Sequence, residues 1–409
     1  MTALRAPGAR GHVRPGPPPL LLIYSVTVTG ILNNTLIGPA IPDILDAFDQ
    51  PSSRAGLLVA SGALPGIVVA PLIGVLADRF GRRRVLVPCL VVFGVGGGLA
   101  ALAPSFALLL LLRLIQGAGG AGLINLAVVI IGDHWTGTER AKLVGRNAAT
   151  LTISLAIFPA VGGLLTELGS WRWSFAPYPL ALVTAALIWR MLPDIELHPQ
   201  PAVASQLRDA GRVLRQPLLA RATLAAFGVF FLIFGLYLTV LPVLLEDRFG
   251  LSAGARGLVL AAPALSSTAA ALVVGRLRAG YGGRALVLFG SVCFTVAFVT
   301  IGFAPSLIVV LIGGLFYGLG EGLSIPTYQD FVAGSAPAAS RGAVVAVWVG
   351  AARAGQVAGP LAAGAALSTL LPGAVFVVGG ALAAATLVAQ LRADTSVRPA
   401  LQGTPAGEG

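Results

Sequence analysis

Twelve long apolar runs are the feature that most constrains how this chain can fold. Each run is about twenty residues long, which is the length an α-helix needs to cross the hydrocarbon core of a bilayer. Helices satisfy their own backbone hydrogen bonds in lipid, where no water is present to do so. The pattern therefore predicts an all-α membrane protein with twelve transmembrane helices. The predicted limits are 19–41, 55–77, 85–103, 106–132, 143–167, 173–192, 218–245, 257–275, 285–304, 306–332, 342–366 and 373–391.

The amino-acid composition supports a lipid environment. Hydrophobic residues make up 56% of the chain and charged residues 11%, whereas soluble domains have about 25% charged residues. The 53 glycines fit lipid-embedded helices that approach one another closely. The net charge of +11 is spread over many short loops, as orientation in a membrane requires, so no nucleic-acid partner is expected.

Basic residues predict which side of the membrane each loop faces. Most of the 27 Lys and Arg residues fall on one side of the predicted helices, and only Arg54, Arg172, Arg248 and Arg256 fall in loops on the other. Because Lys and Arg accumulate in cytoplasmic loops, the pattern predicts a multi-pass protein of the cell membrane. Both chain termini are predicted to be cytoplasmic.

A polar stretch at 193–217 divides the chain into two halves. We interpret it as a cytoplasmic linker between two six-helix bundles, which span residues 19–192 and 218–392. The polar segments 1–18 and 393–409 are predicted to be disordered cytoplasmic tails.

The two bundles also repeat each other in sequence at a constant offset of 201 residues. The offset pairs Gly74 with Gly275 and Pro159 with Pro360. Two repeats of six helices have parallel topology and are related by a pseudo-two-fold axis along the membrane normal. The predicted fold class is therefore two parallel-repeat six-helix bundles.

A short charged loop joins the second and third predicted helices. It reads Gly74-Val75-Leu76-Ala77-Asp78-Arg79-Phe80-Gly81-Arg82-Arg83. A central Arg or Asp costs about 2.5 to 3.5 kcal/mol in hydrocarbon, so this loop must lie at a membrane face. Orientation alone explains the arginines but not the acid. The repeat places Ala279 opposite Asp78, which makes Asp78 the candidate switch.

These features together resemble the major facilitator superfamily over nearly the whole chain. The charged loop is similar to the family's loop between helices 2 and 3, and Arg113-x-x-Gln116-Gly117 resembles its helix 4 signature. In helix 5, Pro159-x-x-Gly162-Gly163 resembles a motif of the twelve-helix drug:H+ antiporter group, with Phe158 in place of its first glycine. Helix 11 carries a counterpart formed by Gly355, Gly359 and Pro360.

The resemblance implies a secondary active transporter, not an enzyme, which alternates access by rocking its two halves. It favours proton-coupled efflux of a small organic or drug-like compound. Uptake or exchange of a small metabolite, such as a sugar or an organic anion, is the alternative, followed by a non-transporting membrane sensor. The family expectation is a monomer in the lipid bilayer that uses protons as its energy source and holds no cofactor. It also implies a gating loop of Gly74, Asp78, Arg79, Gly81, Arg82 and Arg83, whose acid approaches the N-terminus of helix 11 in the outward-facing state.

Ionisable residues inside predicted helices are candidates for function. Glu321 is the only acid deep in a predicted helix, and Arg353 lies at a similar depth in the next helix. Burial favours the neutral form of an acid, while a nearby Arg favours the ionised form. We therefore expect the two to couple protons or to bind substrate; the alternative is a static ion pair between helices 10 and 11.

The remaining polar candidates lie in helices 1 and 4. Asn33 and Asn34 would cost several kcal/mol if their amides faced lipid unpaired, so they face either the substrate cavity or another helix. Arg113 and Gln116 are candidate cavity residues, and the family implicates the matching arginine in proton handling. Asp43, Asp46 and Asp49 follow helix 1 and are interpreted as a solvated face, with a cation-attracting vestibule as the alternative. The three histidines lie far apart, so no metal is expected.

Overall fold

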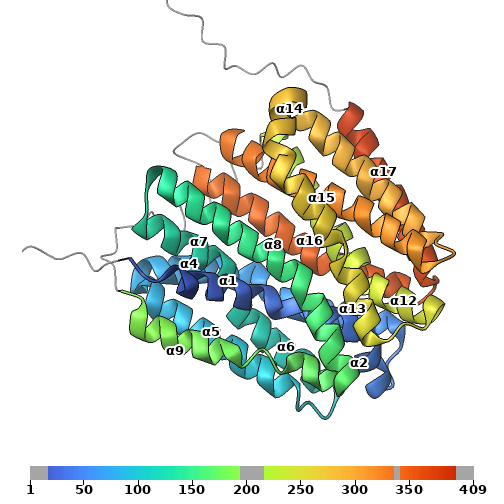
Figure 1. Cartoon of the computed structure of the whole chain (residues 1–409), viewed down its shortest axis with the longest axis horizontal. Helices are drawn as coiled ribbons and strands as arrows, with labels where there is room; N and C mark the ends of the chain where they lie inside the picture. Colours follow the sequence, from blue (N-terminus) through green and yellow to red (C-terminus); the bar gives the residue numbers. More distant parts are fainter. Residues whose placement is uncertain (1–16, 194–215, 336–340, 393–409) are drawn as a thin grey trace, which may run out of the picture.

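The computed structural model describes residues 17–193, 216–335 and 341–392, and a helix occupies each of the twelve predicted ranges (Figure 1). The predicted tails at 1–18 and 393–409 and the predicted linker at 193–217 lie almost entirely outside the described residues.

The N-terminal half begins at α1 and ends at α9. Its elements are α1 (Leu20–Thr35), η1 (Gly38–Ala40), α2 (Ile41–Ala47), η2 (Ser52–Arg54), α3 (Ala55–Ala63), α4 (Gly66–Phe80), α5 (Arg82–Ala100), α6 (Phe106–Gly120), α7 (Leu123–His134), α8 (Gly137–Leu168), η3 (Trp171–Phe175) and α9 (Leu180–Met191). The C-terminal half contains α11 (Pro217–Leu232), the π-helix η4 (Ile233–Val240), α12 (Leu241–Phe249), α13 (Ala253–Ala261), α14 (Pro263–Gly302), α15 (Leu307–Ser335), α16 (Arg341–Ala366) and α17 (Pro372–Arg392).

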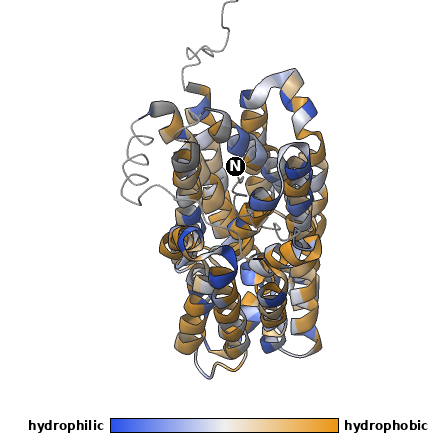
Figure 2. Ribbon diagram, turned by 90° about the vertical axis from the view of Figure 1, so that its left-hand side faces the viewer, coloured by the Kyte–Doolittle hydropathy of each residue, from blue (hydrophilic) through white to orange (hydrophobic). Residues whose placement is uncertain are grey.

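By length and composition, ten continuous helical spans of the described residues can cross a membrane. One of them, Ala253–Gly302, contains two predicted helices that meet at Gly282. Hydrophobic residues predominate along the ribbons, as the predicted contact with lipid requires (Figure 2). The membrane fold class is confirmed.

The sixth predicted helix, 173–192, was wrong in its first part. There the chain forms the 3-10 helix η3, and α9 begins only after Pro179. Pro177 and Pro179 lack backbone N–H groups and so interrupt the helix, although both lie in an apolar run. The limits of the fifth predicted helix, 143–167, were also too narrow, because α8 continues through polar turns to Gly137.

The sequence repeat reappears in backbone geometry at the two turns. Gly81 between α4 and α5 has φ 97° and ψ 148°, and Gly282, 201 residues later, has φ 81° and ψ 155°. Side chains with a Cβ rarely adopt such positive φ values, so glycine is required at both turns.

The two halves contact each other through a symmetric pair of bare backbone surfaces. A Cβ atom at Gly56 would overlap the carbonyl oxygen of Pro360, and one at Gly257 would overlap the carbonyl oxygen of Pro159. These contacts join α3 to α16 and α13 to α8. Gly56 and Gly257 are 201 residues apart in the sequence, and so are Pro159 and Pro360. The sequence repeat therefore produces the same contact twice.

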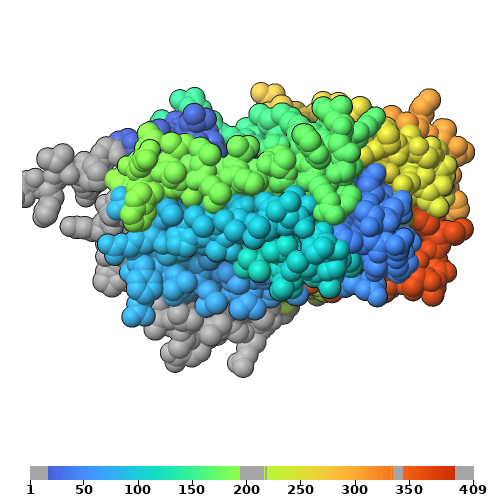
Figure 3. Space-filling view, turned by 90° about the horizontal axis from the view of Figure 1, so that it is seen from below, coloured from blue at the N-terminus to red at the C-terminus, as the bar shows by residue number. Residues whose placement is uncertain are grey.

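Most contacts between the halves lie toward one end of the molecule, called here the Arg256 end, where α2, α12 and α13 lie together (Figure 1). Seen from below, the blue-to-green surface of the N-terminal half meets yellow-to-red atoms of the C-terminal half at the end that carries α2 (Figure 3). The opposite end, called here the Asp78 end, carries the turns at Gly81 and Gly282. Cβ atoms at Gly145 in α8 and Gly350 in α16 would meet no atom within 4 Å, so the other half does not cover these positions.

Candidate functional site

A buried arginine organises the polar residues of the N-terminal half. Arg113 in α6 is 0% exposed. Its Nη1 donates to the backbone oxygen of Asn33 (2.7 Å) and to Oε1 of Gln116 (2.8 Å), and its Nη2 donates to Oδ1 of Asn34. The Asn33 amide donates to the backbone oxygen of Gly62 at 2.8 Å. In this structure both asparagines therefore contact other helices and join α1, α3 and α6.

Tyr178 completes this cluster and is a residue that the sequence prediction missed. It is fully buried, and its hydroxyl donates to the backbone oxygen of Leu32 at 2.9 Å. A tyrosine between Pro177 and Pro179 at a helix start was the available signal, but nothing in the sequence linked it to helix 1.

Glu321 lies in α15 within the C-terminal half. The Ser267 hydroxyl of α14 lies within hydrogen-bonding reach of its carboxylate. Two tyrosines lie near the carboxylate, Tyr237 of η4 and Tyr317 one turn earlier in α15. Their rings stack with centroids 4.0 Å apart and planes 8° from parallel. Glu321 therefore sits in a polar and aromatic setting formed by three helical segments.

Arg353 does not pair with Glu321 in this structure, so the alternative of a static ion pair between helices 10 and 11 is wrong here. Its Nη1 donates to Oε1 of Gln356 and its Nη2 to the backbone oxygen of Ala121, both at 3.2 Å. Ala121 belongs to the N-terminal half, at the break between α6 and α7. The guanidinium thus points across to the other half while Glu321 faces its own half, although the two residues lie on consecutive helices.

The charged loop ties together helices of its own half. Asp78 forms an ion pair with Arg82 one turn later, and Arg82 Nε donates to Oδ2 of Asp133 at the end of α7 (2.9 Å). Arg83 lies over the Trp189 ring of α9, 5.2 Å from its centroid, and Arg79 lies over the ring of Phe80. The contacts described for Asp78 stay within the N-terminal half. A Cβ atom added at Gly74 would meet no atom within 4 Å.

The glycines predicted to mediate helix packing contact the backbone of neighbouring helices. Gly162 faces Leu36, and Gly163 faces Ala253 of the other half. Gly355 and Gly359 both face the backbone of α11 at Phe231. Side chains at these positions would separate the helices.

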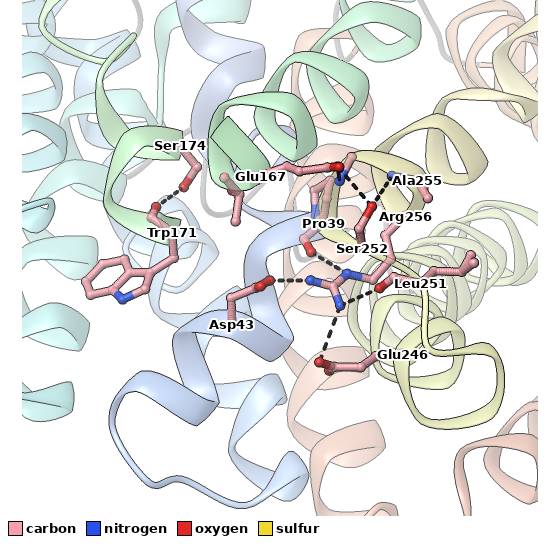
Figure 4. A network of polar contacts seen from close by, with 12 residues as sticks. Pro39, Asp43, Glu167, Trp171, Ser174, Glu246, Leu251, Ser252, Ala255 and Arg256 are labelled. Atoms are coloured by element: carbon pink, nitrogen blue, oxygen red, sulfur yellow. Dashed lines mark hydrogen bonds and ion pairs between the residues drawn. The ribbon is translucent and has the colours of Figure 1, made fainter. Parts of the chain in front are cut away.

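A second charged cluster lies at the Arg256 end and joins the two halves (Figure 4). We define the Arg256 cluster as Arg256 with its acid partners Asp43 and Glu246. Arg256 is 2% exposed and forms an ion pair with Asp43 of α2; its Nη1 lies 3.5 Å from Oε1 of Glu246 in α12. Its Nε donates to the backbone oxygen of Pro39 (2.9 Å) and its Nη1 to that of Leu251 (3.1 Å).

A further polar contact crosses between the halves beside this cluster. Oε2 of Glu167, at the end of α8, accepts from the Ser252 hydroxyl (2.9 Å) and the Gly254 backbone N–H (2.8 Å). Gly254 lies in the first turn of α13, where a carboxylate is favoured by the helix dipole. Two acids of the N-terminal half, Asp43 and Glu167, therefore hold the start of α13.

The interpretation of Asp43, Asp46 and Asp49 as a solvated face was incomplete for Asp43, which is partly exposed but forms an ion pair with Arg256 of the other half. The sequence signal that could have found its partner is Arg256 itself. It is one of four basic residues on the sparsely charged side, and the repeat places Ala55 opposite it. Neither the orientation of the protein in the membrane nor the sequence repeat explains an arginine at position 256.

Comparisons with known proteins agree with this architecture. The family described as Major Facilitator Superfamily matches residues 23–280 and 226–407. The bacillibactin exporter of Bacillus subtilis (strain 168) is 26% identical over 329 residues, which cover 76% of this chain and 81% of that protein. The class D tetracycline resistance protein of Salmonella ordonez is 27% identical over 361 residues, or 84% of this chain and 88% of that protein.

A solved structure also has the same fold. It is a bacterial homologue of the human lysosomal transporter Spinster, in an inward-facing and occupied conformation. Its TM-score is 0.73 at 19% identity, and the alignment covers 91% of this chain and 94% of that one.

Proposed function

This chain belongs to the Major Facilitator Superfamily, and from that premise we propose that it exports a small organic compound in exchange for protons. The family and its relatives are transporters, so the chain is a multi-pass membrane transporter and not an enzyme. The names of the two relatives, a bacillibactin exporter and a tetracycline resistance protein, support the outward direction of transport. The proposal places a monomer in the cell membrane with both termini in the cytoplasm, driven by the proton gradient without a cofactor.

The observation that carries the proposal is the unequal contact between the halves at the two ends. At the Arg256 end they are joined by backbone contacts and a buried ion cluster. At the Asp78 end, positions such as Gly145 and Gly350 are uncovered. A transporter that alternates access needs a central site reached from one side at a time. The basic loops near Asp78 support assigning that end to the cytoplasm, which makes this an inward-facing arrangement.

Glu321 is our candidate for proton coupling. It is the acid that the sequence places mid-helix, and its neighbours are the neutral groups of Ser267, Tyr237 and Tyr317. Intramembrane acids in such settings serve as proton relays in transporters. A carboxyl group without a fixed cation can exchange its proton as the site is exposed to each side in turn.

Transport in proteoliposomes tests the proposal. The purified protein is reconstituted with a pH-sensitive dye inside, and a pH gradient is imposed in either direction against a panel of organic compounds. Exchange of a compound for protons moves them in opposite directions, and this is the expected result. Movement in the same direction would support the uptake alternative, and a protein that moves neither compound nor protons would contradict transport.

Replacing Asp78 with Asn is expected to slow transport by about two- to fivefold while membrane insertion stays normal. The physical reason is the family expectation that this acid reaches the N-terminus of helix 11 when the Asp78 end closes, where a carboxylate contributes about 0.3 to 1 kcal/mol. Transport rate per inserted molecule is the measurement.

Asp133→Asn is the matched control for that experiment, because it removes the other acid partner of Arg82. A gating role for Asp78 predicts a larger loss for D78N than for D133N. Equal losses would assign the effect to the pairing of Arg82 within the N-terminal half.

A further inference from the structure

We infer that Arg353 and Gln356 form a binding site for an anionic group of the transported compound, one with two neighbouring oxygens such as a carboxylate. The inference rests on the proposed function for the statement that the ligand is transported. The presence of an anion site on this chain is argued independently below and is tested by binding alone.

The first argument is the charge of Arg353. Its two hydrogen-bond acceptors, the Gln356 side chain and the Ala121 backbone carbonyl, are both neutral. The intramembrane acid on the neighbouring helix, Glu321, faces Ser267 and the two tyrosines instead. Cations within membrane-spanning segments pair with opposite charges or backbone carbonyls. In this structure the Arg353 guanidinium therefore has a carbonyl partner and no countercharge.

The second argument is the place of Arg353 between the halves. Ala60, Ala63 and Val357 form a small apolar cluster where α3 packs on α16. Arg353 lies one turn further toward the Asp78 end and contacts the first turn of α4 near Gly66, with its Nη1 3.6 Å from the Cβ position there. At Gly350, about one turn beyond, the space is open. Arg353 thus lies where the two halves part, within reach of a compound that enters from the open end.

Comparison with Arg113 shows why Arg353 is the accessible cation of the two. Arg113 is 0% exposed, with its Nη groups engaged by Asn33, Asn34 and Gln116. Arg353 is half-buried and makes two hydrogen bonds in this structure. Because a guanidinium carries five N–H donors in a planar fork, Arg353 has donors left for a ligand.

The geometry of these donors selects the ligand class. Two parallel N–H groups of a guanidinium match two oxygens of one carboxylate, and such charge-assisted pairs are about twice as strong as neutral hydrogen bonds. Gln356 supplies an amide that can donate to the same group. A neutral sugar or an organic cation would leave the Arg353 charge uncompensated.

Binding at this site also has a consequence for the contact between the halves. The Nη2 group that would engage a carboxylate is the one that donates to Ala121 across the interface. An anion that accepts from Nη2 competes with this carbonyl. Ligand binding and this hydrogen bond between the halves are therefore linked through the Nη2 atom of Arg353.

Equilibrium binding to the purified full-length protein in zwitterionic phosphatidylcholine nanodiscs tests the inference. The probes are three compounds with the same ring system: 2-naphthoate, 2-naphthalenemethanol and 2-naphthylmethylammonium. We expect calorimetry to detect naphthoate as the tightest ligand. Arg353→Gln should weaken naphthoate binding by about tenfold or more, since a hydrogen bond to a charged group contributes that much, and Arg353→Lys should weaken it less.

Arg172→Gln is the matched control, because the hydrogen-bond acceptors of Arg172 are likewise neutral: they are the backbone carbonyls of Ala101 and Ala103, at the Arg256 end. It should bind naphthoate as the unchanged protein does.

Three results would overturn the inference. They are unchanged naphthoate affinity in R353Q, equal affinity of the unchanged protein for the neutral alcohol, and loss of naphthoate binding when phosphatidylglycerol replaces phosphatidylcholine. The last would identify a lipid headgroup as the occupant. Failure of the proposed function is distinguishable, because it would appear as a protein that binds naphthoate through Arg353 yet transports no compound in proteoliposomes.

Discussion

Replacing Arg256 with Gln is expected to shift the protein toward the state in which the Arg256 end is open. The substitution removes a buried cation and leaves Asp43 and Glu246 without their partner, and the carbonyls of Pro39 and Leu251 lose a donor. Breaking a buried ion pair from one side costs about 3 to 5 kcal/mol.

Exposure to solvent reduces this free-energy cost for the Arg256 cluster. The side chains of Asp43 and Glu246 are 37% and 38% exposed, although Arg256 itself is 2% exposed. With screening of the two acids, we expect a change of about 1.5 kcal/mol in the equilibrium between the two states. That change corresponds to about a tenfold shift in their ratio.

Distance measurements between spin labels across the Arg256 end provide the readout. Labels at A47C in α2 and D247C in α12 occupy exposed positions, after the native Cys89 and Cys293 are replaced. The unchanged protein should show the shorter distance, and R256Q should show a second, longer population.

Arg248→Gln is the matched control for this measurement. Arg248 lies at the end of α12, also at the Arg256 end of the molecule. Its Nη1, however, donates to backbone carbonyls of its own half, those of Gly302 and Ala304, both at 3.1 Å. It should leave the distance distribution unchanged. A single short distance in R256Q, or the same longer population in R248Q, would refute the role of the Arg256 cluster.

Replacing Glu321 with Gln is expected to abolish proton-driven transport, with a loss of more than tenfold in initial rate. Gln keeps the size and hydrogen-bonding capacity of a protonated glutamate but cannot release a proton. Exchange of labelled for unlabelled compound across the membrane, without a pH gradient, should continue. This difference between driven transport and exchange separates a coupling role from a general loss of folding.

The acid at Asp330 offers a control on the same helix. It is exposed and pairs with Arg278 at 2.5 Å near the Asp78 end, so Asp330→Asn should leave proton-driven transport near its original rate. If E321Q retained full proton-driven transport, the coupling role of Glu321 would be abandoned, and another group would have to carry the proton.

Apolar length and the 201-residue repeat were sufficient to predict the helices and the glycine turns. Gly81 and Gly282 share a positive φ because the same local turn is needed in both halves. The start of α9 was predicted wrongly because a hydropathy pattern does not register the missing N–H of Pro179. The glycine turns and the start of α9 both depend on the local sequence, so a local pattern is enough to predict them when it takes the right residue property into account.

Partners far apart in the chain were harder to predict. Asp43 and Arg256 are 213 residues apart, and each, taken alone, is a plausible solvent-exposed charge. The alternative of an ion pair between Arg353 and Glu321 rested on their similar depth, but depth does not fix the direction of a side chain around its helix. Arg353 instead reaches Ala121, 232 residues away. Such pairings depend on how the two halves are placed, which no local pattern encodes.

The backbone contacts at Gly56 and Gly257 bear on how fast the protein can change state. At both positions a glycine lies against a proline carbonyl, so the backbone contact at these two points has no interlocking side chain to release. The Arg256 cluster is different, because several bonds to one guanidinium must break before the ends can separate. Breaking these bonds therefore adds to the activation barrier for opening this end, on one side of a nearly symmetric interface. Sequence changes at this cluster can adjust the rate of the transport cycle while the symmetric contacts remain as they are.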